Sequence, residues 1–202
     1  MKKLVSLWLL GIVISFGANA QKSSGMFFNM GSGYIYNTNQ PDFYKYTIGR
    51  AMSFGLYNHF MIKSVPSKLN FDFSLNNFNY QADSIGAVAL QNKIGVDFFI
   101  NPFHSDGELF KMYLAVGVYS VFQTRSFEPS SNLETINDGF SGYAGLAFKV
   151  NYVFPIYNTD KHESALSIGF AFCPKGLLIG KSDIPKFTTS AFTLGFQFGR
   201  KR

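Results

Sequence analysis

The sequence of 202 residues contains one cysteine, Cys173, and few charged residues. A single cysteine excludes an internal disulfide and a cysteine-rich metal cluster. Charged residues make up 15% of the chain, well below the roughly 25% that is usual in soluble domains. Aromatic residues reach 18%, and a soluble protein this aromatic and this poor in charge would risk aggregation. The composition therefore disfavours a soluble globular protein.

The chain also has no apolar run after residue 20 that approaches the roughly 18 residues needed for a transmembrane helix. A closed β-barrel is then the remaining way to cross a bilayer, because it satisfies the backbone hydrogen bonds between strands. A G-x-S-x-G motif, a P-loop and a zinc motif are all missing. Apart from the tail Arg200-Lys201-Arg202, the mature chain is nearly neutral, which argues against a nucleic-acid-binding surface.

The first 20 residues have the three parts of a secretory signal peptide. Two lysines follow the first methionine, an apolar stretch covers 4–17, and Ala18-Asn19-Ala20 fits a cleavage site. An uncleaved anchor helix is the alternative, but the apolar stretch is shorter than the roughly 20 residues of a membrane span. We expect a signal peptide over 1–20 and one domain over 21–202.

Two stretches near the end of the chain, Leu166–Phe172 and Phe192–Phe198, alternate large apolar residues with small or polar ones. A period of two is typical of a β-strand with two unlike faces. The polar face carries Ser, Gly, Ala, Thr and Gln, where a soluble sheet would show Lys and Glu to water. An apolar outer face with a small, uncharged inner face is typical of a β-barrel in lipid.

The same alternation recurs upstream, so we predict an all-β fold: an eight-stranded antiparallel up-and-down transmembrane β-barrel. The other six expected strands cover about 26–36, 45–58, 68–79, 87–100, 111–122 and 141–154. An even number of strands places both barrel ends in the periplasm.

The connections divide between the two sides of the expected barrel. Those over 63–67, 101–108 and 157–163 face the periplasm, where Pro66, Pro102, Gly107 and Pro155 are expected to break the strand ladders. The longest connections, about 123–139 and 174–186, face outside, as is usual for this class of barrel.

Inward-facing glycines recur beside Tyr113, Tyr119 and Tyr143. An eight-stranded barrel has an interior just wide enough for side chains to fill, and alternating small and large residues pack such a narrow taper. We therefore predict a lumen filled by its own side chains rather than an open pore.

The last expected strand ends in Phe196-Gln197-Phe198. This aromatic-x-aromatic ending resembles the signal by which outer-membrane barrels are recognised for assembly. With the signal peptide and eight strands, the chain resembles the outer-membrane β-barrel domain family, the OmpA/OmpX-type small, porin-family-like barrels of Gram-negative bacteria, over essentially all of 21–202. The resemblance implies a monomer in the cell outer membrane that contacts membrane lipid, lipopolysaccharide and the assembly machinery. It specifies architecture rather than activity.

Four charged residues fall on the expected lumen face: Asp72, Lys93, Asp97 and Lys149. Counted from the expected periplasmic strand ends, Asp72, Asp97 and Lys149 lie at similar depth. Buried charges cost several kcal/mol unless they pair. We interpret these residues as a salt-bridge network that fills and fixes the lumen, and an ion path or proton relay is the alternative. The sequence predicts no catalytic, cofactor or metal site.

Arg50 and Asn92 interrupt the apolar face of their strands. An arginine at the bilayer midplane of a barrel costs about 2–4 kcal/mol, and about 0–1 kcal/mol near an interface. We therefore expect Arg50 near the outer rim, where it could pair with a lipopolysaccharide phosphate. The alternative is a β-bulge that turns its side chain inward.

His162 and Ser164, with Glu163 between them, match the His-x-Ser spacing of lipid A deacylases. The match is short and falls in a connection expected on the periplasmic side, so we interpret it as a polar turn. We expect a non-enzymatic integral outer-membrane protein that acts in envelope integrity or surface interaction. The alternatives are a small-solute channel, a lipid A-modifying barrel enzyme and an accessory subunit of a secretion machine.

Overall fold

The computed structural model describes residues 23–36, 47–82, 85–103, 110–128, 139–174, 180–182 and 187–201. The expected signal peptide over 1–20 lies outside the described residues, so it stays a prediction. None of the described segments forms a helix long and apolar enough to cross a membrane.

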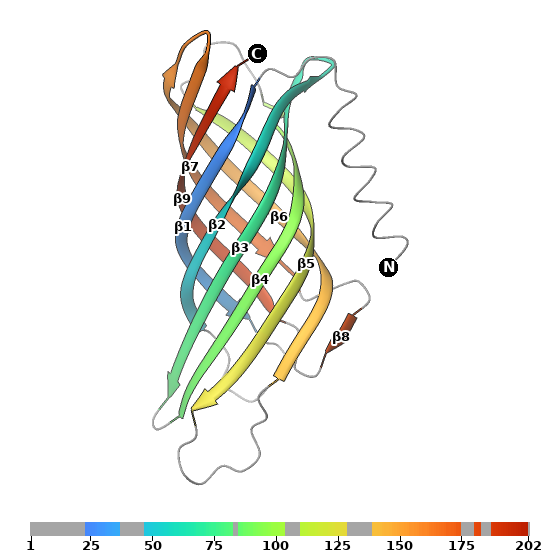
Figure 1. The fold of residues 1–202 in the computed structure, drawn as a ribbon, viewed down its shortest axis with the longest axis vertical. Helices are drawn as coiled ribbons and strands as arrows, with labels where there is room; N and C mark the ends of the chain where they lie inside the picture. Colours follow the sequence, from blue (N-terminus) through green and yellow to red (C-terminus); the bar gives the residue numbers. More distant parts are fainter. Residues whose placement is uncertain are drawn as a thin grey trace.

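Eight long antiparallel strands form a closed ring (Figure 1). They are β1 (Ser23–Tyr36), β2 (Thr47–Ile62), β3 (Val65–Ala82), β4 (Ile85–Ile100), β5 (Lys111–Glu128), β6 (Gly139–Asn158), β7 (His162–Cys173) and β9 (Thr188–Lys201). The ring closes because β1 pairs with β9 as well as with β2. A short ninth strand, β8 (Gly180–Ser182), pairs only with the start of β6 among the described strands. The predicted eight-stranded antiparallel up-and-down barrel is confirmed.

The outer face of the barrel is a band of large apolar side chains. Phe170 is 48% exposed and Phe196 is 47% exposed, so both point away from the lumen. Other outward residues of this kind are Met26, Phe28, Met30, Ile48, Phe54, Leu56, Val116, Phe148, Phe192, Leu194 and Phe198. Such a band is typical of the surface that a barrel turns toward lipid.

We call the end where β1 begins and β9 ends the terminal end, and the opposite end the distal end. At the terminal end, β2 and β3 are joined by the two-residue turn Lys63-Ser64, in which Lys63 has a φ of 55°. The expectation that Pro66 and Pro155 break the ladders is wrong. Pro66 is the second residue of β3, and Pro155 lies inside β6 beside a register shift. Strand starts and bulges are positions where a sheet tolerates proline, because no ladder N–H is needed there.

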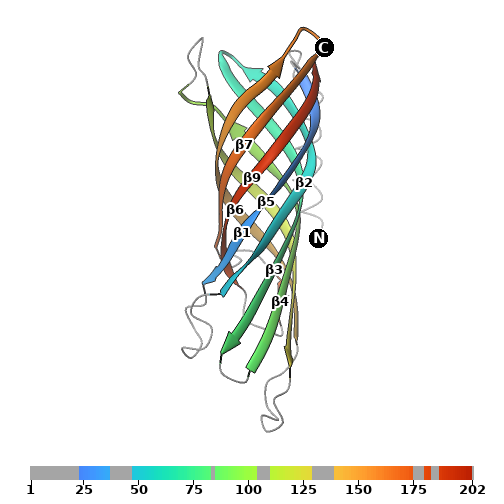
Figure 2. The same ribbon diagram turned by 90° about the vertical axis from the view of Figure 1, so that its left-hand side faces the viewer.

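At the distal end the strands differ in length. β3, β4, β5 and β6 have 16 to 20 residues, whereas β7 has 12. Figure 2 shows β3 and β4 reaching beyond the ends of β1 and β2. The outer loop expected over 123–139 begins later than predicted. Strand β5 continues to Glu128, and Gln123 is fully buried inside the barrel.

Glycines make room for the large residues of the lumen. Tyr119 on β5 lies in register with Gly95 on β4 and with Gly145 on β6. A Cβ atom added at Gly95 would lie 2.4 Å from Cδ1 of Tyr119, and one added at Gly117 would lie 2.1 Å from Oδ1 of Asp97. These glycines are required by close approach, and the tyrosine ring covers the space that they leave.

Candidate functional site

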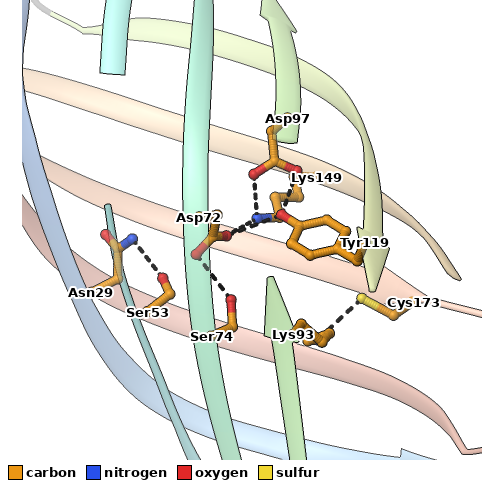
Figure 3. A network of polar contacts seen from close by, with 9 residues as sticks. All are labelled: Asn29, Ser53, Asp72, Ser74, Lys93, Asp97, Tyr119, Lys149 and Cys173. Carbon is orange, nitrogen blue, oxygen red and sulfur yellow. Dashed lines mark hydrogen bonds and ion pairs between the residues drawn. The ribbon is translucent and has the colours of Figure 1, made fainter. Parts of the chain in front are cut away.

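The centre of the lumen holds a charged cluster contributed by four strands, which we call the central network: Asp72, Asp97, Tyr119 and Lys149. Nζ of Lys149 on β6 lies 2.5 Å from Oδ2 of Asp72 on β3 and 2.6 Å from Oδ2 of Asp97 on β4. The hydroxyl of Tyr119 on β5 lies 2.5 Å from Oδ1 of Asp97 and 3.0 Å from Oδ2 of Asp72. Figure 3 shows these side chains converging in the lumen from the four consecutive strands β3 to β6. Ser74 donates a further hydrogen bond to Asp72.

The tilt of the strands explains why residues at different register positions meet. Asp72 is in register with Gly95 on β4, and Asp97 lies two residues further toward the terminal end. Lys149 is in register with Phe99 through Ala115, so it lies two more residues in the same direction. Strands of a barrel tilt by about 35–45°, so residues at one depth shift in register from strand to strand. The cluster is therefore a level layer across the lumen.

Lys93 was expected on the same lumen face, and it lies outside the central network. It is four residues from Asp97 along β4, which is a separation of about 13 Å in an extended strand. Its Nζ atom lies 3.3 Å from Sγ of Cys173, which is also buried in the lumen. Among the described residues Lys93 forms no ion pair with a carboxylate.

Sequence reasoning missed a third luminal lysine, Lys68, which is 0% exposed. Its Nζ atom lies 4.6 Å from the ring centroid of Phe99, 5.3 Å from that of Tyr113 and 5.9 Å from that of Tyr57. Nζ has no hydrogen-bond partner among the residues that the structure describes. The alternation along β3 could have identified Lys68, because it lies four residues before the inward-facing Asp72.

At the terminal end, Glu163 joins a group of polar side chains inside the lumen. Its Oε1 atom accepts hydrogen bonds from Oγ of Ser23 at 2.7 Å and from the hydroxyl of Tyr57 at 3.0 Å. Nδ1 of His59 lies 3.3 Å from the same oxygen, and the ring of His59 stacks on Tyr113 at 6.1 Å between centroids. The side chains of this group are joined to one another near the terminal end of the barrel.

Ser23, His59 and Glu163 have the residue types of a catalytic triad but a different geometry. In a triad the serine and the acid contact opposite ring nitrogens. Here the serine Oγ is 3.0 Å from Nδ1, the nitrogen that also faces the glutamate, and Nε2 has no partner among the described residues. His162 and Ser164 lie on the outer face while Glu163 points inward. Neither group is arranged to activate a serine.

At the distal end the lumen is covered by an apolar cluster of Ile35, Phe78 and Phe187. Below this cluster, Tyr143 and Gln123 share a hydrogen bond of 3.1 Å, and Gln91 contacts Tyr143. Beside the central network the lumen holds a cavity of about 60 Å³, which is room for a few water molecules. In the described part of the chain, no group of His, Cys, Asp and Glu residues is placed to hold a metal ion.

On the outer face, Arg50 is exposed and is in register with Ser32 on β1 and Asn77 on β3. The register of β2 is continuous past this position, so no bulge turns Arg50 into the lumen. On β4 and β5 the same register continues through Leu90 and Thr124. Asn92 lies two residues from Leu90, and Ser120 lies four residues from Thr124, both toward the terminal end of the barrel. From strand to strand these polar residues shift in register in the same direction as the residues of the central network. They therefore lie at a similar depth on the outer face, and we call them the outer polar line.

No family model matches the sequence, and no curated protein matches it. Solved structures do resemble it. Neisserial surface protein A has a TM-score of 0.52 at 11% identity, over 86% of this chain and 95% of that protein. Ail, the attachment invasion locus protein of Yersinia pestis, has a TM-score of 0.51 at 9% identity, over 89% of this chain and 99% of that protein. A second Ail structure, in complex with the heparin analogue sucrose octasulfate, has a TM-score of 0.50 at 9% identity over the same shares of the two chains.

At such low identity these likenesses concern the fold, and both solved proteins match along nearly their full length. They agree with the closed ring of eight strands. The chain therefore has the fold of the small eight-stranded outer-membrane β-barrels.

Proposed function

We propose that this protein is a non-enzymatic, integral β-barrel of the outer membrane with a sealed lumen, and that it acts in envelope integrity or surface interaction. The observation that carries the proposal is the lumen itself. An apolar cluster lies at its distal end, the group around Glu163 lies at its terminal end, and a cavity of about 60 Å³ lies beside the central network. A molecule built in this way presents surfaces rather than a passage.

The outer face supports the placement in a membrane. Large apolar side chains of every ring strand are exposed there, as in Phe54, Val116 and Phe192. Exposed apolar surface of this extent is unfavourable in water and favourable in lipid. We place the terminal end in the periplasm. The first strand of the barrel begins there and the last strand ends there, and in even-stranded barrels of this type both of these ends face the periplasm.

The outer polar line supports contact with the outer leaflet. Arg50, Asn77 and Asn92 lie at one depth, with the exposed rings of Tyr34 and Tyr36 further toward the distal end. Aromatic belts and basic side chains mark membrane interfaces. A guanidinium at this level can bind a lipopolysaccharide phosphate with two hydrogen bonds.

Surface interaction is also suggested by the named proteins of this fold. One is called a surface protein, the other is named for attachment and invasion, and the latter was solved with a heparin analogue. For the present chain we propose the same class of role, carried by lipid contacts and by the distal end.

Conductance in planar bilayers tests the sealed lumen. The purified protein should show no steady open state under conditions in which a known porin conducts. A stable conductance would overturn the sealed lumen and favour the small-solute channel. The mass of lipid A from cells that express the protein should be unchanged, and a mass shift that disappears in His162→Ala would establish a lipid-modifying enzyme instead.

The lipopolysaccharide contact is tested by the substitution Arg50→Ala. Retention of lipopolysaccharide after detergent extraction should fall about fivefold, since one basic residue at an anionic membrane surface contributes that much. Lys63→Ala, which removes an exposed charge at the terminal end, is the matched control and should retain the wild-type amount. Equal retention by both variants would rule out Arg50 as the contact.

A further inference from the structure

A second polar row crosses the outer face at the terminal end, where the apolar band stops. On β9 the outward residues are apolar up to Phe198, which is 57% exposed, and the next outward residue is the exposed Arg200. Phe198 is in register with Met26 on β1, whereas Arg200 is in register with Ser24 on β1 and with His162 on β7. The surface changes from apolar to basic within one step along the strand.

Basic residues gather around this step. The backbone N–H of Lys201 donates to the carbonyl oxygen of Lys161 at 2.9 Å, which holds the end of β9 against the turn between β6 and β7. This contact brings Lys161 near Arg200, which is in register with His162, and Asp160 is the acidic residue of that turn. Lys201 alternates to the other side of β9, and its Nζ atom donates a hydrogen bond to Oδ1 of Asn158. Within the described ranges, neither Lys161 nor Arg200 forms an ion pair. We call Lys161, His162 and Arg200 the basic rim.

The apolar surface directly beside the basic rim suits an acyl chain. The rings of Phe196 and Phe198 are stacked, with centroids 6.4 Å apart and an angle of 20° between planes. Both rings face outward, so they form a strip that leads from the middle of the band to Arg200. A lipid lying along this strip would bring its headgroup phosphate to the guanidinium.

We propose that the basic rim binds the headgroup phosphate of an anionic glycerophospholipid in the leaflet around the terminal end, with Arg200 as the principal contact. A guanidinium presents paired N–H donors that match two oxygens of a phosphate. The lipid should be anionic rather than zwitterionic, because the unpaired cations repel one another and a net negative headgroup relieves that repulsion. This inference rests on the proposed membrane placement and adds a lipid class and a site to it.

The experiment uses the full mature protein in nanodiscs or micelles, with phosphatidylglycerol and phosphatidylcholine as probes. Bound lipid is counted by native mass spectrometry for the wild type and for Arg200→Gln, Arg200→Lys and Lys63→Gln. Lys63→Gln is the matched control, because it removes one exposed charge in the turn between β2 and β3 at the same end. Circular dichroism establishes that each variant keeps its β-sheet signal.

The wild type should retain more phosphatidylglycerol than phosphatidylcholine. Arg200→Gln should lower the retained phosphatidylglycerol about fivefold, while Arg200→Lys should keep most of it and Lys63→Gln should match the wild type. Added inorganic phosphate at millimolar concentration should not displace the lipid, since free phosphate lacks the acyl chains that contact Phe196 and Phe198.

Equal retention of the two lipids by the folded wild type, or wild-type retention by Arg200→Gln, would overturn the inference and leave the membrane placement intact. Displacement by inorganic phosphate would identify a site for free anions instead and would also overturn it. Protein that stays folded and dissolved without any amphiphile would overturn the membrane placement and the lipid site together.

Discussion

Two regions of the lumen bury a lysine in opposite ways. In the central network, Lys149 faces Asp72 and Asp97 at 2.5 and 2.6 Å. Nearer the terminal end, Lys68 has no hydrogen-bond partner in the described structure and lies over the rings of Phe99, Tyr113 and Tyr57. Lys68 is fully buried and Lys149 is mostly buried, and of the two only Lys149 is in direct contact with carboxylates.

The two environments differ in energy. Burial of an ammonium group costs several kcal/mol, and a desolvated cation over an aromatic face recovers about 2 kcal/mol per favourable contact. Two carboxylates in direct contact offset more of this burial cost. Without the lysine, the two carboxylates would themselves be buried charges with no counter-charge. Lys149 therefore locks the network that joins four strands, whereas Lys68 fills space at a cost that its aromatic neighbours reduce.

The strongest test of this comparison is Lys149→Met. The variant leaves Asp72 and Asp97 buried without a counter-charge, so we expect it to lose about 3–5 kcal/mol of unfolding free energy. Urea unfolding in phospholipid vesicles, followed by circular dichroism, measures the loss. A change below about 1 kcal/mol would mean that the aspartates find another partner and that Lys149 does not lock the network.

Tyr119→Phe should have an intermediate effect. It removes a hydroxyl that lies 2.5 Å from Oδ1 of Asp97 and 3.0 Å from Oδ2 of Asp72, while keeping the ring over Gly95. Hydrogen bonds to charged groups contribute about 1.5–3 kcal/mol, so the same unfolding measurement should show a loss in that range. If Tyr119→Phe unfolds like the wild type, the hydroxyl is not part of the network.

Lys68→Met should have the smallest effect, within about 1 kcal/mol of the wild type in either direction. Replacing a buried charge that lacks a carboxylate partner with an apolar side chain of similar length is often neutral or stabilising. The unfolding free energies of Lys68→Met and Lys149→Met are measured under identical conditions. Equal losses in the two variants would contradict the distinction between the two lysines.

The alternation of large and small residues was enough to predict the barrel, its eight strands and the outward direction of Phe170 and Phe196. The strand ends were predicted less well. The sequence predicts breaks in the ladders at Pro66 and Pro155, but the ladder continues around them because one lies at a strand start and the other beside a bulge. Gln123 was assigned to a loop, and the extension of β5 buries it inside the lumen.

The candidate site was predicted in part. The lumen face of each strand could be read from its alternation, which identified Asp72, Asp97 and Lys149 as residues that point inward. Counting residues from the expected periplasmic strand ends also predicts a similar depth for Asp72, Asp97 and Lys149, without Lys93, and the structure brings these three residues into contact. The partnership with Tyr119 was missed, because that contact crosses between strands at different register positions.

The sequence by itself determined which side of each strand meets lipid and which side meets the lumen, because the side-chain period of a β-strand is fixed at two. Only the tertiary structure decided which luminal charges meet. The tilt of the strands shifts residues of equal depth from strand to strand, and that shift brings Lys149 to two carboxylates while it leaves Lys68 among aromatic rings.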